Sequence, residues 1–140
     1  MGYRSCVAIL MYGEKRECDM VVDLFLHSGE IQQEDKDFFE EHKQEHSAGA
    51  QHFVFWSFDN VKWYDQADIA KNKLFNLVSQ IENTNDKGDP ADRESLAIEF
   101  VRFGEDSNDN EQEATERTAY LLDIRRRIIY PEFLQWSPPD

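Results

Sequence analysis

The chain has 140 residues and a formal net charge of −14, from 29 Asp and Glu against 15 Lys and Arg. This length predicts a single domain, 1–140, that is large enough to bury a core without disulfides. The negative charge repels nucleic acid and anionic membranes, so the composition argues against direct binding to DNA, RNA or a lipid surface.

The first third of the sequence predicts one strand and two helices. Residues 5–12, SCVAILMY, are apolar on both faces, as in a central strand. Residues 14–28 predict a helix with Cys18, Val21, Val22 and Phe25 on one face. Residues 30–46 predict a second helix with an apolar stripe that includes Phe38 and Phe39, and residues 47–50, SAGA, predict a linker after it.

The middle of the chain predicts a strand, a helix and a loop. Residues 52–64 alternate aromatic and polar side chains, with Asp59-Asn60 as a turn or bulge signal. Residues 66–82 predict a helix, and residues 83–92, NTNDKGDPAD, have the composition of a loop. The core-facing positions expected on the helix are Ala70, Leu74, Leu77, Val78 and Ile81.

The last third predicts two strands around an acidic loop. Residues 95–103 predict a strand, residues 104–116 a solvated loop, residues 118–130 a final strand, and residues 131–140 a C-terminal tail. We expect the two strands to pair with each other. The complete order, β-α-α-β-α-β-β, predicts an α+β fold with an antiparallel or mixed sheet of about four strands and about three helices.

The cysteines and the hydropathy indicate the compartment. Cys6 and Cys18 are the two cysteines, and so few in a chain of this size predict free thiols in a reducing compartment. The N-terminal residues lack the long apolar run and cleavage site of a signal peptide, and no apolar run reaches transmembrane length. We therefore expect a cytoplasmic protein that does not interact with membranes.

The motif HKQEH, residues 42–46, matches the H-x-x-E-H order of the inverted zinc proteases. On a helix, His42 and His46 could face one Zn²⁺, and Glu113 or Glu116 could be nominated as a third ligand. The motif lies at a helix end beside a small-residue linker, so we interpret the histidines as side chains that flank the apolar stripe. We expect no catalytic residues and no cofactor, and a small metal-dependent hydrolase built on this motif is the alternative.

The acidic residues of the second predicted helix form one row, because their spacings are 4, 3, 4 and 4 residues. Such side chains are ~5–6 Å apart, and the phosphates of one DNA strand follow each other at ~3.4 Å. The row could therefore imitate a phosphate track and bind a basic surface, or it could be a solvated face. The candidate partner-binding residues are Glu30, Glu34, Asp37, Glu41 and Glu45, with Glu105, Asp106 and Asp109 of the acidic loop.

Three short segments of the chain resemble a family of small uncharacterised proteins from tailed phages and prophages. They are MGYRS at residues 1–5, which opens directly into a strand, VKWY at residues 61–64, and FVRFGED at residues 100–106. The resemblance implies a phage setting and the cytoplasm of a host cell, and it supplies no catalytic residues. In that setting small acidic proteins are often inhibitors of host machinery.

The sequence therefore predicts a non-enzymatic interaction protein. We expect it to bind and inhibit a host defence or nucleic-acid-processing protein through that protein's basic, nucleic-acid-binding surface, as a mimic of nucleic acid. A virion or housekeeping accessory protein, whose charge confers solubility alone, is a further alternative.

Overall fold

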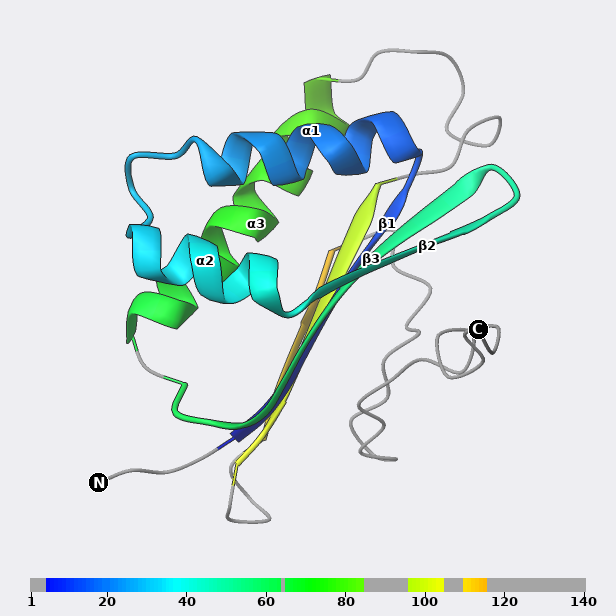
Figure 1. Cartoon of the computed structure of the whole chain (residues 1–140). Helices are drawn as coiled ribbons and strands as arrows, with labels where there is room; N and C mark the ends of the chain where they lie inside the picture. Colours follow the sequence, from blue (N-terminus) through cyan, green and yellow to red (C-terminus); the bar gives the residue numbers. More distant parts are fainter. Residues whose placement is uncertain (1–4, 64, 85–95, 105–109, 116–140) are drawn as a thin grey trace.

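The computed structural model describes residues 5–63, 65–84, 96–104 and 110–115. The elements are β1 (Ser5–Gly13), α1 (Lys15–Leu26), α2 (Gln33–Glu41), β2 (Lys43–Ala48), β3 (Gln51–Val61), α3 (Asp65–Thr84), β4 (Ala97–Phe103) and β5 (Asn110–Ala114). The strands form an antiparallel sheet in the order β2-β3-β1-β4-β5, and the three helices lie on one face of it (Figure 1). The predicted α+β class is confirmed, with five strands in place of about four.

The main core lies between the helices and the sheet. Cys18, Val21 and Phe25 of α1 pack with Phe39 of α2. The α3 side chains in this core are Ala70, Leu74, Leu77 and Val78, and the strand side chains opposite include Ile9, Met11, Val54, Trp56, Phe58, Ile98 and Phe100. The helical periodicities of 14–28 and 66–82 therefore predicted the buried faces correctly, apart from Val22 and Ile81, which are partly buried at the edge of the core.

The opposite face of the sheet carries a second cluster of buried apolar side chains. In the part of the chain that the structure describes, its members all come from strands: Ala8, Leu10, Tyr12, Phe53, Phe55, Ala97, Val101 and Phe103. Strand β1 contributes to both clusters, which confirms the prediction that residues 5–12 form a central strand. The bulge signal at Asp59-Asn60 is also confirmed, because β3 has one extra residue against β1 between Phe58 and Val61.

The predicted second helix is wrong at both ends. It covers Gln33–Glu41 instead of 30–46, and residues 43–48 form strand β2. Ala48 pairs with Gln51, so the first half of the predicted linker belongs to β2 and residues 49–50 are the turn of a hairpin. Gly49 has the positive φ of 63° that such a turn requires. The pairing of β2 with an aromatic strand outweighs the helical periodicity of the glutamates.

The predicted elements after residue 95 need one correction. Residues 110–114 of the expected acidic loop form the edge strand β5, and they pair with residues 99–103 of β4. Strand β4 therefore has β1 along one edge and β5 along the other, so the expected pairing of 95–103 with 118–130 is wrong. The predicted final strand, the tail at 131–140 and most of the predicted loop at 83–92 lie outside the described residues.

Candidate functional site

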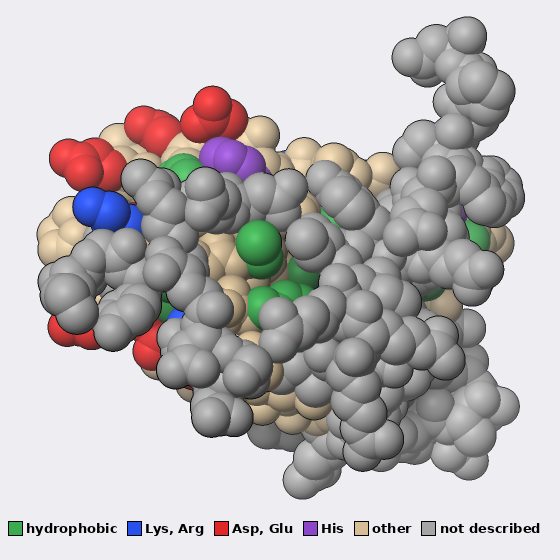
Figure 2. Space-filling view, turned by 90° about the horizontal axis from the view of Figure 1, so that it is seen from below, with side chains coloured by type: hydrophobic (Ala, Val, Ile, Leu, Met, Phe, Trp, Pro, Cys, Tyr) green, Lys and Arg blue, Asp and Glu red, His purple; other side chains and the backbone are tan. Residues whose placement is uncertain are grey.

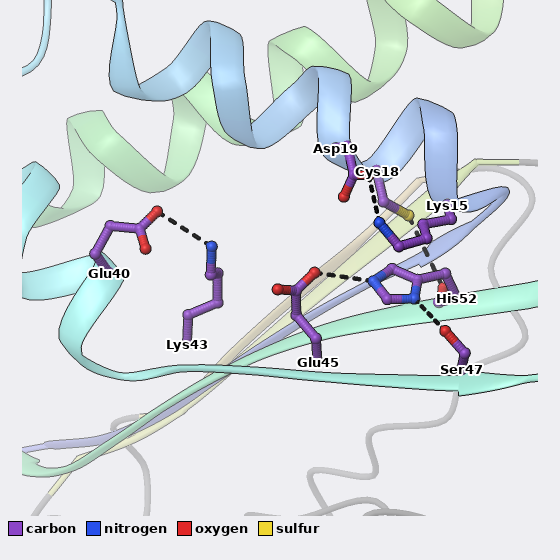
Figure 3. A network of polar contacts seen from close by, with 8 residues as sticks. All are labelled: Lys15, Cys18, Asp19, Glu40, Lys43, Glu45, Ser47 and His52. Atoms are coloured by element: carbon purple, nitrogen blue, oxygen red, sulfur yellow. Dashed lines mark hydrogen bonds and ion pairs between the residues drawn. The ribbon is translucent and has the colours of Figure 1, made fainter.

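A polar network lies between the start of α1 and the β2–β3 hairpin (Figure 3). In the hairpin, Glu45 is opposite Val54 and Ser47 is opposite His52. Residues that face each other in an antiparallel pair have side chains on the same side of the sheet. Val54 belongs to the core under the helices, so Glu45, Ser47 and His52 all face the helical layer.

His52 is the centre of this network and is only 5% exposed. Its Nε2 atom is 2.9 Å from Oε1 of Glu45, and its Nδ1 atom is 2.6 Å from Oγ of Ser47. A carboxylate can only accept hydrogen bonds, so in the neutral ring Nε2–H donates to Glu45 and Nδ1 accepts the Ser47 hydroxyl hydrogen. The hairpin therefore fixes both nitrogens of a buried imidazole.

Helix α1 places Cys18 and Asp19 over this imidazole (Figure 3). The Cys18 thiol is 3.9 Å from the backbone oxygen of His52, and Lys15 Nζ is 2.7 Å from Oδ2 of Asp19. Burial, with a smaller contribution from the charge of Asp19, raises the pKa of Cys18 to about 12. The thiol is thus protonated at neutral pH and is neither a nucleophile nor a thiolate ligand.

A shallow cleft of about 190 Å³ continues from this network between α1 and β2. Its lining residues are Asp19, Val22, Asp23, Leu26, Glu40, Lys43 and Glu45. Four of them carry carboxylates and one carries an ammonium group, which is held 3.2 Å from Oε1 of Glu40. The cleft combines a negative potential with an apolar wall, and such a site fits a cation or a basic side chain with an aliphatic stem.

The structure separates the two histidines of HKQEH. His42 ends α2, donates from Nδ1 to the backbone oxygen of Phe38 at 2.9 Å, and packs its ring 5.1 Å from Phe58 in the main core. His46 lies in β2 opposite Phe53, which belongs to the other face of the sheet. The motif is therefore divided between a helix end and a strand, and the helical metal pair that it suggested does not form.

The acidic row is exposed, but it is not one helical face. Glu34, Asp37 and Glu41 lie in α2 at spacings that share a face. Glu30 precedes the helix and is 3.2 Å from Nζ of Lys73, and Glu45 lies in β2. All five predicted carboxylates are exposed, and the view from below shows acidic side chains at its left end, with Lys or Arg side chains among them (Figure 2). Glu105, Asp106 and Asp109 lie outside the described residues.

Three residues of this site, Asp19, Ser47 and His52, were not predicted from the sequence. A signal for them was present, because Gly49 lies between a polar segment and an alternating aromatic one, which is a hairpin pattern. With that hairpin in register, alternation puts His52 on the same side as Val54, in the buried core.

Comparison with protein-family models, with curated proteins and with solved structures found no match for this chain. In the described ranges, no helix is both long enough and apolar enough to cross a membrane.

Proposed function

We propose that this protein is a non-enzymatic binding protein whose acidic surface occupies the basic, nucleic-acid-binding surface of another protein. The observation that carries this proposal is the exposure of all five carboxylates of the predicted row. They follow one continuous stretch of chain from the turn before α2, along the helix, and into β2. We name this surface, made of Glu30, Glu34, Asp37, Glu41 and Glu45, the acidic surface.

The resemblance to small tailed-phage proteins supplies the setting of the proposal. In that setting the partner is a host defence or nucleic-acid-processing protein, and the acidic surface takes the place of a phosphate backbone. A partner of this kind presents Lys and Arg side chains at the spacing of phosphates. Binding then inhibits the partner, because its nucleic acid and this protein compete for the same surface.

The cleft between α1 and β2 supplies a recognition element beside the acidic surface, and Glu45 belongs to both. An Arg side chain in the cleft would lay its methylene groups on Val22 and Leu26 and direct its guanidinium group to carboxylates. An isolated exposed ion pair contributes at most about 1 kcal/mol. A cleft that holds a basic side chain between several carboxylates adds both affinity and a preferred orientation.

A double charge reversal tests this proposal. Glu34→Lys with Glu41→Lys should abolish co-purification of the partner from host cells and should release the inhibited activity. The two substitutions lie at opposite ends of α2, where their effects on the helix dipole oppose each other. We therefore expect the free energy of unfolding to change by about 0.5 kcal/mol or less. Binding by the wild type should weaken steeply with salt, because exposed charges are screened over ~10 Å at 0.1 M.

The matched control adds the same positive charge at exposed positions outside the acidic surface. Asp65→Lys with Asn76→Lys and Gln112→Lys changes the net charge by the same amount, on α3 and in β5. This control should keep the partner, and duplex DNA should displace the partner from the wild type. Inhibition that survives the Glu34 and Glu41 reversals, or that is lost equally in the control, would refute the proposal.

A further inference from the structure

We propose that Asp19, Glu45 and His52 bind one divalent transition-metal ion at the end of the cleft that adjoins the hairpin. The three residues come from α1, β2 and β3, and one ligand atom from each lies within 4.8 Å of the others. This inference concerns the isolated protein and does not depend on the partner proposed above.

The distances suit a shared ion. Zinc bonds to imidazole nitrogen and carboxylate oxygen are ~2.0–2.2 Å long, so two ligands of one ion are ~3–3.5 Å apart. Nε2 of His52 and Oε1 of Glu45 are already 2.9 Å apart. The Asp19 side chain is 49% exposed on the first turns of α1, so its carboxylate has the rotational freedom to close the remaining distance.

The environment of His52 has the form found around metal ligands. A ligating histidine almost always donates its other ring N–H to a nearby polar group, which fixes the ring and its tautomer. The Ser47 hydroxyl stands 2.6 Å from Nδ1 for this role. An ion at Nε2 requires the ring proton to be at Nδ1. Because a hydroxyl can accept a hydrogen bond as well as donate one, Ser47 can then accept the hydrogen bond from Nδ1.

The charges also balance. Two carboxylates and a neutral imidazole supply a charge of −2 to a divalent cation, and they are a ligand set that Zn²⁺ and Mn²⁺ accept. Lys15 now provides the positive charge next to Asp19, with its Nζ atom 2.7 Å from Oδ2. Lys15 is exposed, so it can leave when an ion binds. It therefore competes with the ion for the Asp19 carboxylate.

Titration of the full-length protein with Zn²⁺, after removal of metals with a chelator, tests the site by calorimetry. The wild type should bind one equivalent at micromolar Zn²⁺. Asp19→Asn and Glu45→Gln should each weaken binding by at least the roughly tenfold that loss of an outer partner of a metal ligand costs. Both replaced side chains are exposed, so these variants should fold. Lys15→Gln should tighten binding, because the competing ammonium group is gone.

Asp37→Asn and Glu41→Gln are the matched controls, since they remove the same charges from exposed positions of α2. They should bind Zn²⁺ like the wild type. The absence of saturable binding by the wild type would overturn the site. So would a variant at Asp19 or Glu45 that binds as tightly as the wild type, or equal weakening in the controls.

Discussion

Lys71 links the helical layer to the edge of the sheet, and the contribution of its ion pair to the free energy of unfolding can be tested directly. This α3 side chain is 2% exposed, with Nζ 2.6 Å from Oε1 of Glu113 on β5 and 3.6 Å from Oδ1 of Asp68. The ammonium group also lies 4.7 Å from the ring centre of Phe100. A buried cation thus depends on a partner that is itself 46% exposed.

We expect Glu113→Gln to destabilise the protein more than Lys71→Met does. Loss of one partner of a fully buried ion pair costs about 3–5 kcal/mol. Asp68 and the Phe100 ring keep part of the attraction here, and water reaches Glu113, so the expected cost is about 1–3 kcal/mol. Methionine keeps the apolar stem of Lys71 and removes the charge that burial penalises. Its cost should therefore stay within about 1 kcal/mol.

Urea denaturation of both single variants and of the double variant measures these free energies of unfolding. The control is the pair of Lys73 and Glu30, which joins the same helix to an exposed loop across 3.2 Å. Glu30→Gln should cost no more than about 1 kcal/mol, as exposed pairs do. If Lys71→Met lowers the free energy of unfolding more than Glu113→Gln does, this expectation is wrong. The attraction within the ion pair, and not the cost of an uncompensated buried charge, would then decide the stability.

Two further variants test the thiol and a backbone position. The folded-state pKa of Cys18 is raised from 9.0 to about 12, so the unfolded chain loses the proton first and stability should fall as pH rises from 9 toward 12. The free energy of unfolding should fall by at most about 1.4 kcal/mol per pH unit. Cys18→Ala should remove this pH dependence, as measured by urea titrations at a series of pH values. Equal slopes for the wild type and the variant would contradict this. Gly13 has φ +154°, and an added Cβ would lie 3.0 Å from Cα of Leu96. Gly13→Ala should therefore cost about 1–3 kcal/mol, measured by thermal unfolding, whereas Gly29→Ala, with nothing within 4 Å, should stay within about 0.5 kcal/mol.

The hydrophobic periodicity within single segments predicted those helices and strands that bury many of their side chains. The apolar strand at 5–12, the two core helices and the aromatic strand each carry their periodicity within one segment, and the structure places them as expected. Strand β5 was missed because NEQEA has no apolar alternation and its five residues are all partly or fully exposed. It is a strand because it pairs with β4, and Arg102 reaches Glu111 across that pair at 2.8 Å.

The candidate metal site was not predicted for a related reason. Glu45 and His52 are close in the sequence, on the two strands of the hairpin, but Asp19 belongs to a distant segment. The three residues meet through the register of β2 on β3 and the position of α1 over the hairpin. A helix through residue 46 would have carried Glu45 on the same helical face as the other acidic residues and separated it from His52. Because α2 ends at Glu41, Glu45 lies in β2, where it is part of the acidic surface and also reaches the ligand set.

The place of β1 in the sheet sets the order in which the protein can assemble on the ribosome. This strand precedes the other described elements in the chain, yet its two neighbours, β3 and β4, come much later. About 84 residues separate Gly13 from Ala97, which takes roughly 4–17 s at a synthesis rate of about 5–20 residues per second. During that time the most apolar strand of the described sheet has at most one of its neighbours. The nascent chain therefore exposes an aggregation-prone apolar segment, and we expect a chaperone to shield it until β4 emerges.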